Sequence, residues 1–182
     1  MKIYTNDTLG FSITYPDHWT IVPAAWIKQY MGRASATSEK LAYYLSNGSQ
    51  PFLVAQDPSV PPGLAIPAVK CQAYDPAAIA AVGGIRGVLS LVVSQSTEAF
   101  PDFEVLECVP ECVVAGVKGA RMVASMTVLN PEGEAFHGMS EFYFLPTQAV
   151  VFMVAVTATS DMAYRPEQEL MGIIRSIRLN QA

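Results

Sequence analysis

The side chains that could perform acid–base or nucleophilic chemistry are few and poorly spaced. His18 and His137 are the histidines of the chain. His137 and Glu141 fall on the same face of an expected strand, but four residues at about 3.3 Å each hold them about 13 Å apart. The sequence contains no Gly-x-Ser-x-Gly motif, which would expose a nucleophilic serine. It therefore predicts no catalytic residue and a protein that is not an enzyme.

The sequence signals for a cofactor site or a metal site are equally weak. Gly83-Gly84-x-x-Gly87 partly resembles a nucleotide-binding loop, but it lies inside an apolar helical pattern rather than at a strand-to-helix turn. Cys108 and Cys112 are separated by three residues, not by the two that are typical of zinc sites. With Cys71 they form an odd, sparse set, which predicts buried free thiols; one disulfide or a metal site are the alternatives. The sequence thus predicts no cofactor and no metal.

One stretch of the chain carries charge of a single sign. Between Arg86 and Lys118 there is no lysine or arginine, whereas five carboxylates occur there. These candidate partner-binding residues, here called the acidic segment, are Glu98, Asp102, Glu104, Glu107 and Glu111. They could form a solvated rim, a docking surface for a basic protein or a cation site, although their spacing is not that of an EF-hand loop.

Composition restricts the classes of protein and partner. The chain has 182 residues, 51% hydrophobic and only 15% charged, which excludes an intrinsically disordered chain. Its net charge of −5 has the wrong sign for binding nucleic acid or an anionic membrane. The apolar excess, including eight methionines, fits two core layers, with an oligomer interface or an apolar ligand cleft as alternatives.

Hydrophobic periodicity predicts a mostly antiparallel sheet. Hydrophobic patterning predicts strands over residues 11–15, 19–22, 50–55, 65–73, 103–108, 112–115, 121–129, 135–145 and 149–158. The last of these is apolar on both faces, as in a covered central strand. A turn is expected over residues 130–133 because proline and glycine stand at positions that favour one. Three consecutive strands with short turns indicate an antiparallel meander.

Helices are expected before and after these strands. Asp75 as N-cap and Pro76 at the first helical position open a helix over residues 76–93. A second amphipathic helix is expected over 166–176, and short ones over 24–31 and 38–45. The sequence predicts an α+β fold, in which an antiparallel β-sheet is flanked by helices on both faces as an α/β/α sandwich. Trp19 is expected to pack in the core or at its rim rather than stack on a ligand, and His18 to lie in a solvated turn.

Three short motifs resemble a known family. Residues 9–19 read Leu-Gly-Phe-Ser-Ile-Thr-Tyr-Pro-Asp-His-Trp and resemble the opening of PsbP-like domains. Residues 115–121 are similar to the family's glycine turn, and residues 170–178 to its terminal helix and edge strand. The resemblance implies one PsbP-like domain over residues 1–182, with a fold shared by Ran-binding nuclear import factors and bacterial lipoproteins of unknown function. It brings no set of catalytic residues.

Two functions are compatible with these features. The first is a non-enzymatic protein-interaction or assembly module that uses a sheet edge or the acidic segment. The alternative is a small-molecule or lipid-binding protein with an apolar pocket between helix 76–93 and the sheet. The start of the chain lacks a basic and then apolar leader, so we expect a cytoplasmic protein, or an exported one if a leader was removed. The glycine-interrupted run over residues 77–93 is too short to span a membrane. A homo-oligomer is a further interaction that the apolar excess allows.

Overall fold

The computed structural model covers residues 1–182 and describes all of them except 24, 26, 28–50, 62, 130–133 and 181–182. The expected short helix over 38–45 and the turn over 130–133 lie outside the described residues, as does most of the helix expected over 24–31. Among the described helices, none has both the length and the hydropathy needed to cross a bilayer.

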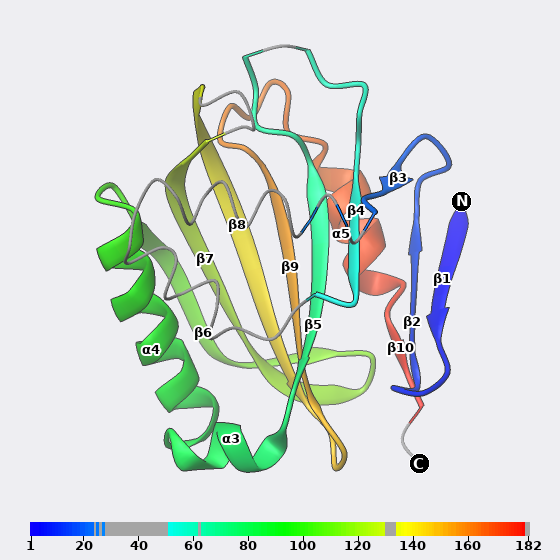
Figure 1. Cartoon of the computed structure of the whole chain (residues 1–182), viewed down its shortest axis with the longest axis vertical. Helices are drawn as coiled ribbons and strands as arrows, with labels where there is room; N and C mark the ends of the chain where they lie inside the picture. Colours follow the sequence, from blue (N-terminus) through cyan, green and yellow to red (C-terminus); the bar gives the residue numbers. More distant parts are fainter. Residues whose placement is uncertain (24, 26, 28–50, 62, 130–133, 181–182) are drawn as a thin grey trace.

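A seven-stranded antiparallel sheet forms the centre of the fold (Figure 1). Its strands are β3 Thr20–Ile21, β4 Leu53–Gln56, β5 Ala68–Tyr74, β6 Glu104–Val114, β7 Val117–Leu129, β8 Ala135–Pro146 and β9 Val151–Thr159. The spatial order is β3-β4-β5-β9-β8-β7-β6, so the four strands β6 to β9 follow the chain as a meander, as predicted. β9 is buried along almost its whole length, which confirms the central strand expected there.

A smaller sheet brings the two ends of the chain together. It consists of β1 Lys2–Asn6, β2 Phe11–Tyr15 and β10 Arg178–Leu179 in the order β1-β2-β10. Alternate residues of β2 (Phe11, Ile13 and Tyr15) are buried, as the alternation of residues 11–15 predicts. The backbone N–H of Asn180 also donates to the carbonyl of Gly10 at 2.8 Å.

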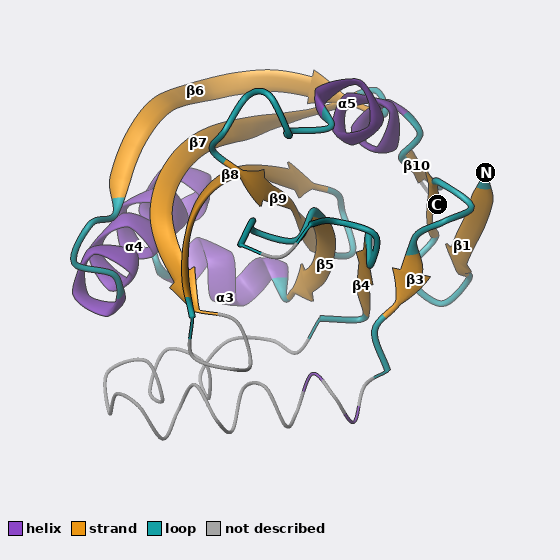
Figure 2. Ribbon diagram, turned by 90° about the horizontal axis from the view of Figure 1, so that it is seen from above, coloured by secondary structure: helices purple, strands orange, loops and turns teal. Residues whose placement is uncertain are grey.

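Helices cover both faces of the larger sheet, which confirms the α+β sandwich. On one face lie α3 Pro76–Ala81 and α4 Gly84–Ala99, and on the other lies α5 Glu167–Arg175 with the smaller sheet (Figures 1 and 2). Leu170, Ile173 and Ile174 form the buried face of α5. They pack in one cluster with Phe11, Trp19, Val69, Tyr143 and Val154, among others. A second cluster joins Ile79, Val88 and Leu89 of α3 and α4 to Met122, Phe144 and Met153 of the sheet.

The single helix expected over residues 76–93 is wrong, because the chain forms two helices there. Asp75 caps α3 as predicted: its Oδ1 accepts the Ala77 N–H at 2.8 Å, and Pro76 is the first helical residue. α3 ends at Ala81, however, and Gly83 then adopts a φ of 92° and Gly84 a φ of 72°. Glycine reaches this left-handed region without the steric cost that a Cβ imposes, so the pair allows the change of direction.

The two strands expected over 103–108 and 112–115 are one strand, β6. Its pairing with β7 shifts between Val105 and Glu107 and again between Val109 and Cys112, so each irregularity takes up extra residues without ending the strand. Pro110 is tolerated because β6 is an edge strand. The hairpin that follows turns through Ala115 and Gly116, both at positive φ (53° and 76°), as a two-residue type I′ turn requires.

All three cysteines are free thiols, as predicted, but only Cys71 is buried. Cys108 is exposed, and Cys112 is half-buried. Cys108 pairs with Met122 and Cys112 with Gly119, three residues apart on β7, so the two thiols lie on opposite faces of the sheet. This placement separates them although they share one strand.

A pair of glycine substitutions tests the junction between α3 and α4. A Cβ on Gly87 would lie 1.7 Å from the carbonyl oxygen of Val82, so Gly87→Ala is expected to cost about 1–3 kcal/mol in free energy of unfolding. Gly172 in α5 has no such neighbour within 4 Å, and Gly172→Ala should stabilise by about 0.5–1 kcal/mol. Urea unfolding followed by circular dichroism measures both. A Gly87→Ala protein as stable as the parent would contradict this helix junction.

Candidate functional site

Strand β6 is a long, mostly exposed strand at one end of the larger sheet. It ends the spatial order and pairs only with β7 among the described strands. Figure 2 shows it as the outermost strand on the side away from β4. Only Val114, its last residue, is buried, and Leu106 is 50% exposed. Three of the five residues of the acidic segment therefore lie on an edge of the sheet that no described strand occupies.

The structure places the five residues of the acidic segment in three settings. Glu98 lies in the last turns of α4, and Asp102 lies in the turn that leads into β6. Glu104, Glu107 and Glu111 are exposed residues of β6 itself. Glu107 and Glu111 share one irregular strand, whereas of the two the sequence placed only Glu107 in a strand. Of the five, Glu98, Glu104 and Glu111 have no cationic partner within ion-pair distance in the described part of the chain.

Asp102 is bound to the sheet rather than free. Its carboxylate accepts the backbone N–H of Thr127 at 3.0 Å and also the Thr127 hydroxyl. The hydrogen bond from that hydroxyl is the main cause that lowers the pKa of Asp102 below its usual value. His137 Nδ1 lies 3.6 Å from the same carboxylate. Asp102 thus stays ionised and joins the start of β6 to β7 and β8.

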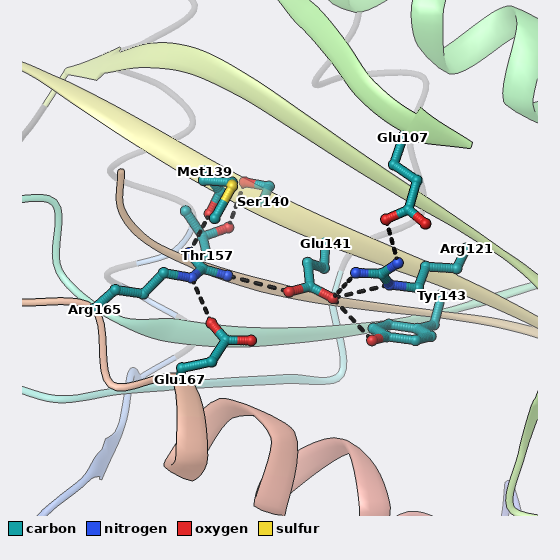
Figure 3. Close-up of polar contacts among 9 residues, drawn as sticks. All are labelled: Glu107, Arg121, Met139, Ser140, Glu141, Tyr143, Thr157, Arg165 and Glu167. Carbon is teal, nitrogen blue, oxygen red and sulfur yellow. Dashed lines mark hydrogen bonds and ion pairs between the residues drawn. The ribbon is translucent and has the colours of Figure 1, made fainter. Parts of the chain in front are cut away.

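Glu107 is the outer end of a chain of ion pairs that crosses the sheet (Figure 3). Its carboxylate lies 2.6 Å from Arg121 Nη1, and Arg121 also donates through Nε to Glu141 at 3.0 Å. The other oxygen of Glu141 lies 3.3 Å from Arg165 Nη2, and Arg165 Nε donates to Glu167 at 2.8 Å. We call these residues the Glu141 network.

The centre of the Glu141 network is buried. The side chains of Arg165 and Glu141 are 0% and 5% exposed, whereas Glu107 is 53% exposed. Arg165 Nη1 also donates to the Met139 carbonyl at 3.2 Å, and the Tyr143 hydroxyl donates to Glu141 at 2.9 Å. The network therefore links β6, β7 and β8 to the start of α5, with both Glu141 oxygens occupied by donors.

The electrostatics of the Glu141 network favour fixed charges. Burial, followed by the charge of Glu141, raises the pKa of Tyr143 to about 12. Partial burial lowers the pKa of Arg121, but its hydrogen bond to Glu107 and the charge of Glu141 outweigh that effect and raise it. Tyr143 thus stays protonated and Arg121 stays charged at neutral pH. These two groups hold structure together and are poorly suited to proton transfer.

The other side chains that could ionise or act as nucleophiles lie apart from one another. Burial raises the pKa of the Cys71 thiol, and it also raises that of Cys112, so both thiols resist ionisation. His18 lies in an exposed turn, as expected, with Nε2 3.5 Å from Asp57 and 3.7 Å from Glu169. His137 lies beside Asp102, whereas Glu141 pairs with Arg121 and Arg165, in keeping with the predicted separation of these two residues. No group of three or more His, Cys, Asp or Glu side chains within the described ranges is arranged to hold a metal.

The sequence interpretation missed the Glu141 network. It placed Glu141 on the same face of its strand as His137, but it did not pair Glu141 with Arg121. The register of β7 with β8 sets Arg121 opposite Tyr143 and Val123 opposite Glu141, so an opposite-charge diagonal pair could have been found from that hairpin. Arg165 precedes α5 in a loop, and no local pattern signals its burial.

Comparison with known proteins finds similarity at the level of structure alone. No protein-family model matches the chain, and no curated protein matches its sequence. The solution structure of cyanobacterial PsbP from Synechocystis matches with a TM-score of 0.61 at 10% identity, over 98% of this chain and 91% of that one. The Ran-binding protein Mog1p of Saccharomyces cerevisiae matches with a TM-score of 0.54 at 10% identity, over 98% and 94%.

A third structure, from Bacteroides thetaiotaomicron, matches with a TM-score of 0.48 at 12% identity. The match covers 98% of this chain, which spans about half (48%) of that longer chain. The two structures above match along nearly their whole length. The chain described here therefore has the PsbP-like fold, which it shares with cyanobacterial PsbP and Mog1p.

Proposed function

We propose that the chain is a non-enzymatic protein-interaction module that docks a basic partner on the acidic segment. The observation that carries this proposal is the exposure of β6 together with its charge. Glu104 and Glu111 project from a free sheet edge, and Glu98 is exposed on the neighbouring helix α4. No lysine or arginine follows Arg86 until Lys118, so this surface attracts cationic groups.

Two further features support an interaction role. β6 pairs with β7 along its length, so the docking surface is held in place before a partner arrives, which lowers the entropic cost of binding. Mog1p, one of the proteins that shares the fold, is a Ran-binding protein. That description concerns Mog1p, and we take from it only that this fold can present a surface to another protein.

The apolar-pocket alternative has less support. Residues 76–93 pack directly on the sheet, where Ile79, Val88 and Leu89 contact a buried cluster that includes Met122 and Phe144. Apolar side chains of the helices and the sheet therefore contact each other at the interface in which the pocket was expected. We retain the interaction module as the proposed function.

Charge reversal on β6 tests this function. The double variant Glu104→Lys/Glu111→Lys changes the net charge by +4 and leaves Glu107, which binds Arg121, in place. In affinity capture from the native host's lysate, we expect the parent to retain a stoichiometric protein that dissociates at high salt, because exposed charges are screened within about 10 Å at 0.1 M. We expect the double variant to lose that protein.

The matched control is Asp7→Lys/Asp161→Lys, which makes the same change of net charge on two exposed carboxylates outside the acidic segment. It should retain the partner. Equal loss in both variants would attribute the capture to net charge, and equal retention in both would exclude the acidic segment as the docking surface.

A further inference from the structure

The free edge of β6 offers more than negative charge. β6 hydrogen-bonds to β7 on one side, and no described strand occupies its other side. The backbone N–H and C=O groups along an unpaired edge are a template on which an extended chain can add as a new strand. Figure 2 shows this edge at the periphery of the molecule, with α4 near its start and α5 near its end.

We propose that an extended, lysine- or arginine-rich segment of the partner adds as a strand to the first half of β6, residues 104–109. This inference rests on the proposed function and specifies its mode: backbone hydrogen bonds align the segment, and its cationic side chains meet the carboxylates of β6.

The first half of β6 is the part suited to pairing. Pro110 has no N–H to donate, and the register shift between Val109 and Cys112 interrupts the strand beside it. Residues 104–109 contain no proline. They also expose Val105 and Leu106, which give an added strand apolar contacts as well as charge.

The irregularity in this half sets the spacing of the charges. Glu104 lies opposite Ser125 and Glu107 opposite Val123, and these two residues of β7 are two positions apart. Glu104 and Glu107 therefore point to the same face of the sheet although they are three positions apart in sequence. An added strand with cationic residues at alternate positions would place them on this face, one beside each carboxylate.

A second copy of this chain fits the edge poorly. Antiparallel pairing of two β6 strands about their midpoint, Val109, places Glu107 opposite Glu111, and a register centred between Glu107 and Cys108 places Glu104 opposite Glu111. Like charges directly opposite each other destabilise a strand pair. The same carboxylates that attract a basic strand thus prevent self-pairing, which is how edge strands gain specificity.

Synthetic peptides test strand addition directly. The probe is the blocked heptapeptide Lys-Thr-Lys-Val-Lys-Thr-Lys, added to isotope-labelled protein and followed by amide NMR. We expect chemical-shift changes centred on residues 104–109 and slower hydrogen exchange of amides there. A peptide of the same charge with proline in place of the central valine should bind at least tenfold more weakly, because proline cannot donate to the ladder and disfavours extension of the strand.

The Glu104→Lys variant of the protein should bind the parent peptide at least tenfold more weakly, whereas the Asp7→Lys variant should bind it with unchanged affinity. Equal binding of the proline peptide would overturn strand addition and leave an electrostatic docking surface, so the proposed function would survive. If the parent peptide does not bind at β6 but the partner is still captured from lysate, strand addition is overturned and the proposed function again survives. The proposed function itself would be refuted by a different outcome: capture of the partner from lysate by the Glu104→Lys/Glu111→Lys variant as efficiently as by the parent.

Discussion

Replacing Glu141 by glutamine is expected to lower the free energy of unfolding by about 3–5 kcal/mol. The carboxylate of Glu141 lies between Arg121 and Arg165, and the guanidinium of Arg165 is wholly buried. Glutamine preserves the volume of the side chain but removes the charge that compensates both arginines. Arg165 would then keep only Glu167 as an ionic partner, at the edge of the buried site. Urea unfolding followed by circular dichroism measures the loss.

The control is Glu107→Gln, which removes the other carboxylate bound to Arg121. Because Glu107 is about half exposed, water solvates its partner once the carboxylate is gone, and the expected cost is below about 1 kcal/mol. Losses of equal size in the two variants would contradict the account of a buried centre and a solvated end. A large loss of stability for Glu141→Gln, but not for Glu107→Gln, would confirm that burial rather than the number of ion pairs determines how much each carboxylate contributes to stability.

This distinction matters for the proposed docking surface. Glu107 contributes little to stability on this account, so a partner's lysine can share its carboxylate with Arg121 without disturbing the fold. Glu141, by contrast, holds β7 and β8 to the start of α5. Variants for binding studies are best made at Glu104 and Glu111, which form no ion pair with the described residues, so that loss of binding reports on the surface itself.

Features governed by local rules could be predicted from the sequence. Alternation identified β2, because every second residue of this strand (Phe11, Ile13 and Tyr15) faces the core. A continuous apolar run identified β9, and the Asp75-Pro76 pair located the start of α3. The same local signals carried the resemblance to PsbP-like domains, and the structural similarity to cyanobacterial PsbP and Mog1p agrees with it.

Features governed by tertiary contacts could not be predicted in the same way. Glycine within a helix costs up to about 1 kcal/mol relative to alanine, which does not decide whether the helix continues or breaks. The break at Gly83 depends on how α3 and α4 each pack on the sheet. The burial of Arg165 depends likewise on the placement of α5. The extent of the domain over residues 1–182 and the role of the acidic segment stay predictions.

Trp19 offers a test of the core in which two effects oppose each other. Its side chain is 0% exposed and packs in the cluster with Phe11 and Leu170, as expected for a core residue. Its indole Nε1 is a buried donor that has no hydrogen-bond partner among the described residues. Leaving a buried donor unpaired costs about 1–3 kcal/mol, so the native side chain carries a penalty together with its packing energy.

We therefore expect Trp19→Ala and Trp19→Phe to differ sharply in urea unfolding. Alanine removes the whole ring and should cost about 3–5 kcal/mol. Phenylalanine leaves a smaller void and removes the unpaired donor, so the two effects should offset to within about 1 kcal/mol. A loss for Trp19→Phe close to that for alanine would show that Nε1 is hydrogen-bonded in solution, for example to a buried water. A small loss would establish that the tryptophan acts through its apolar area, which leaves its indole N–H no part in binding a ligand.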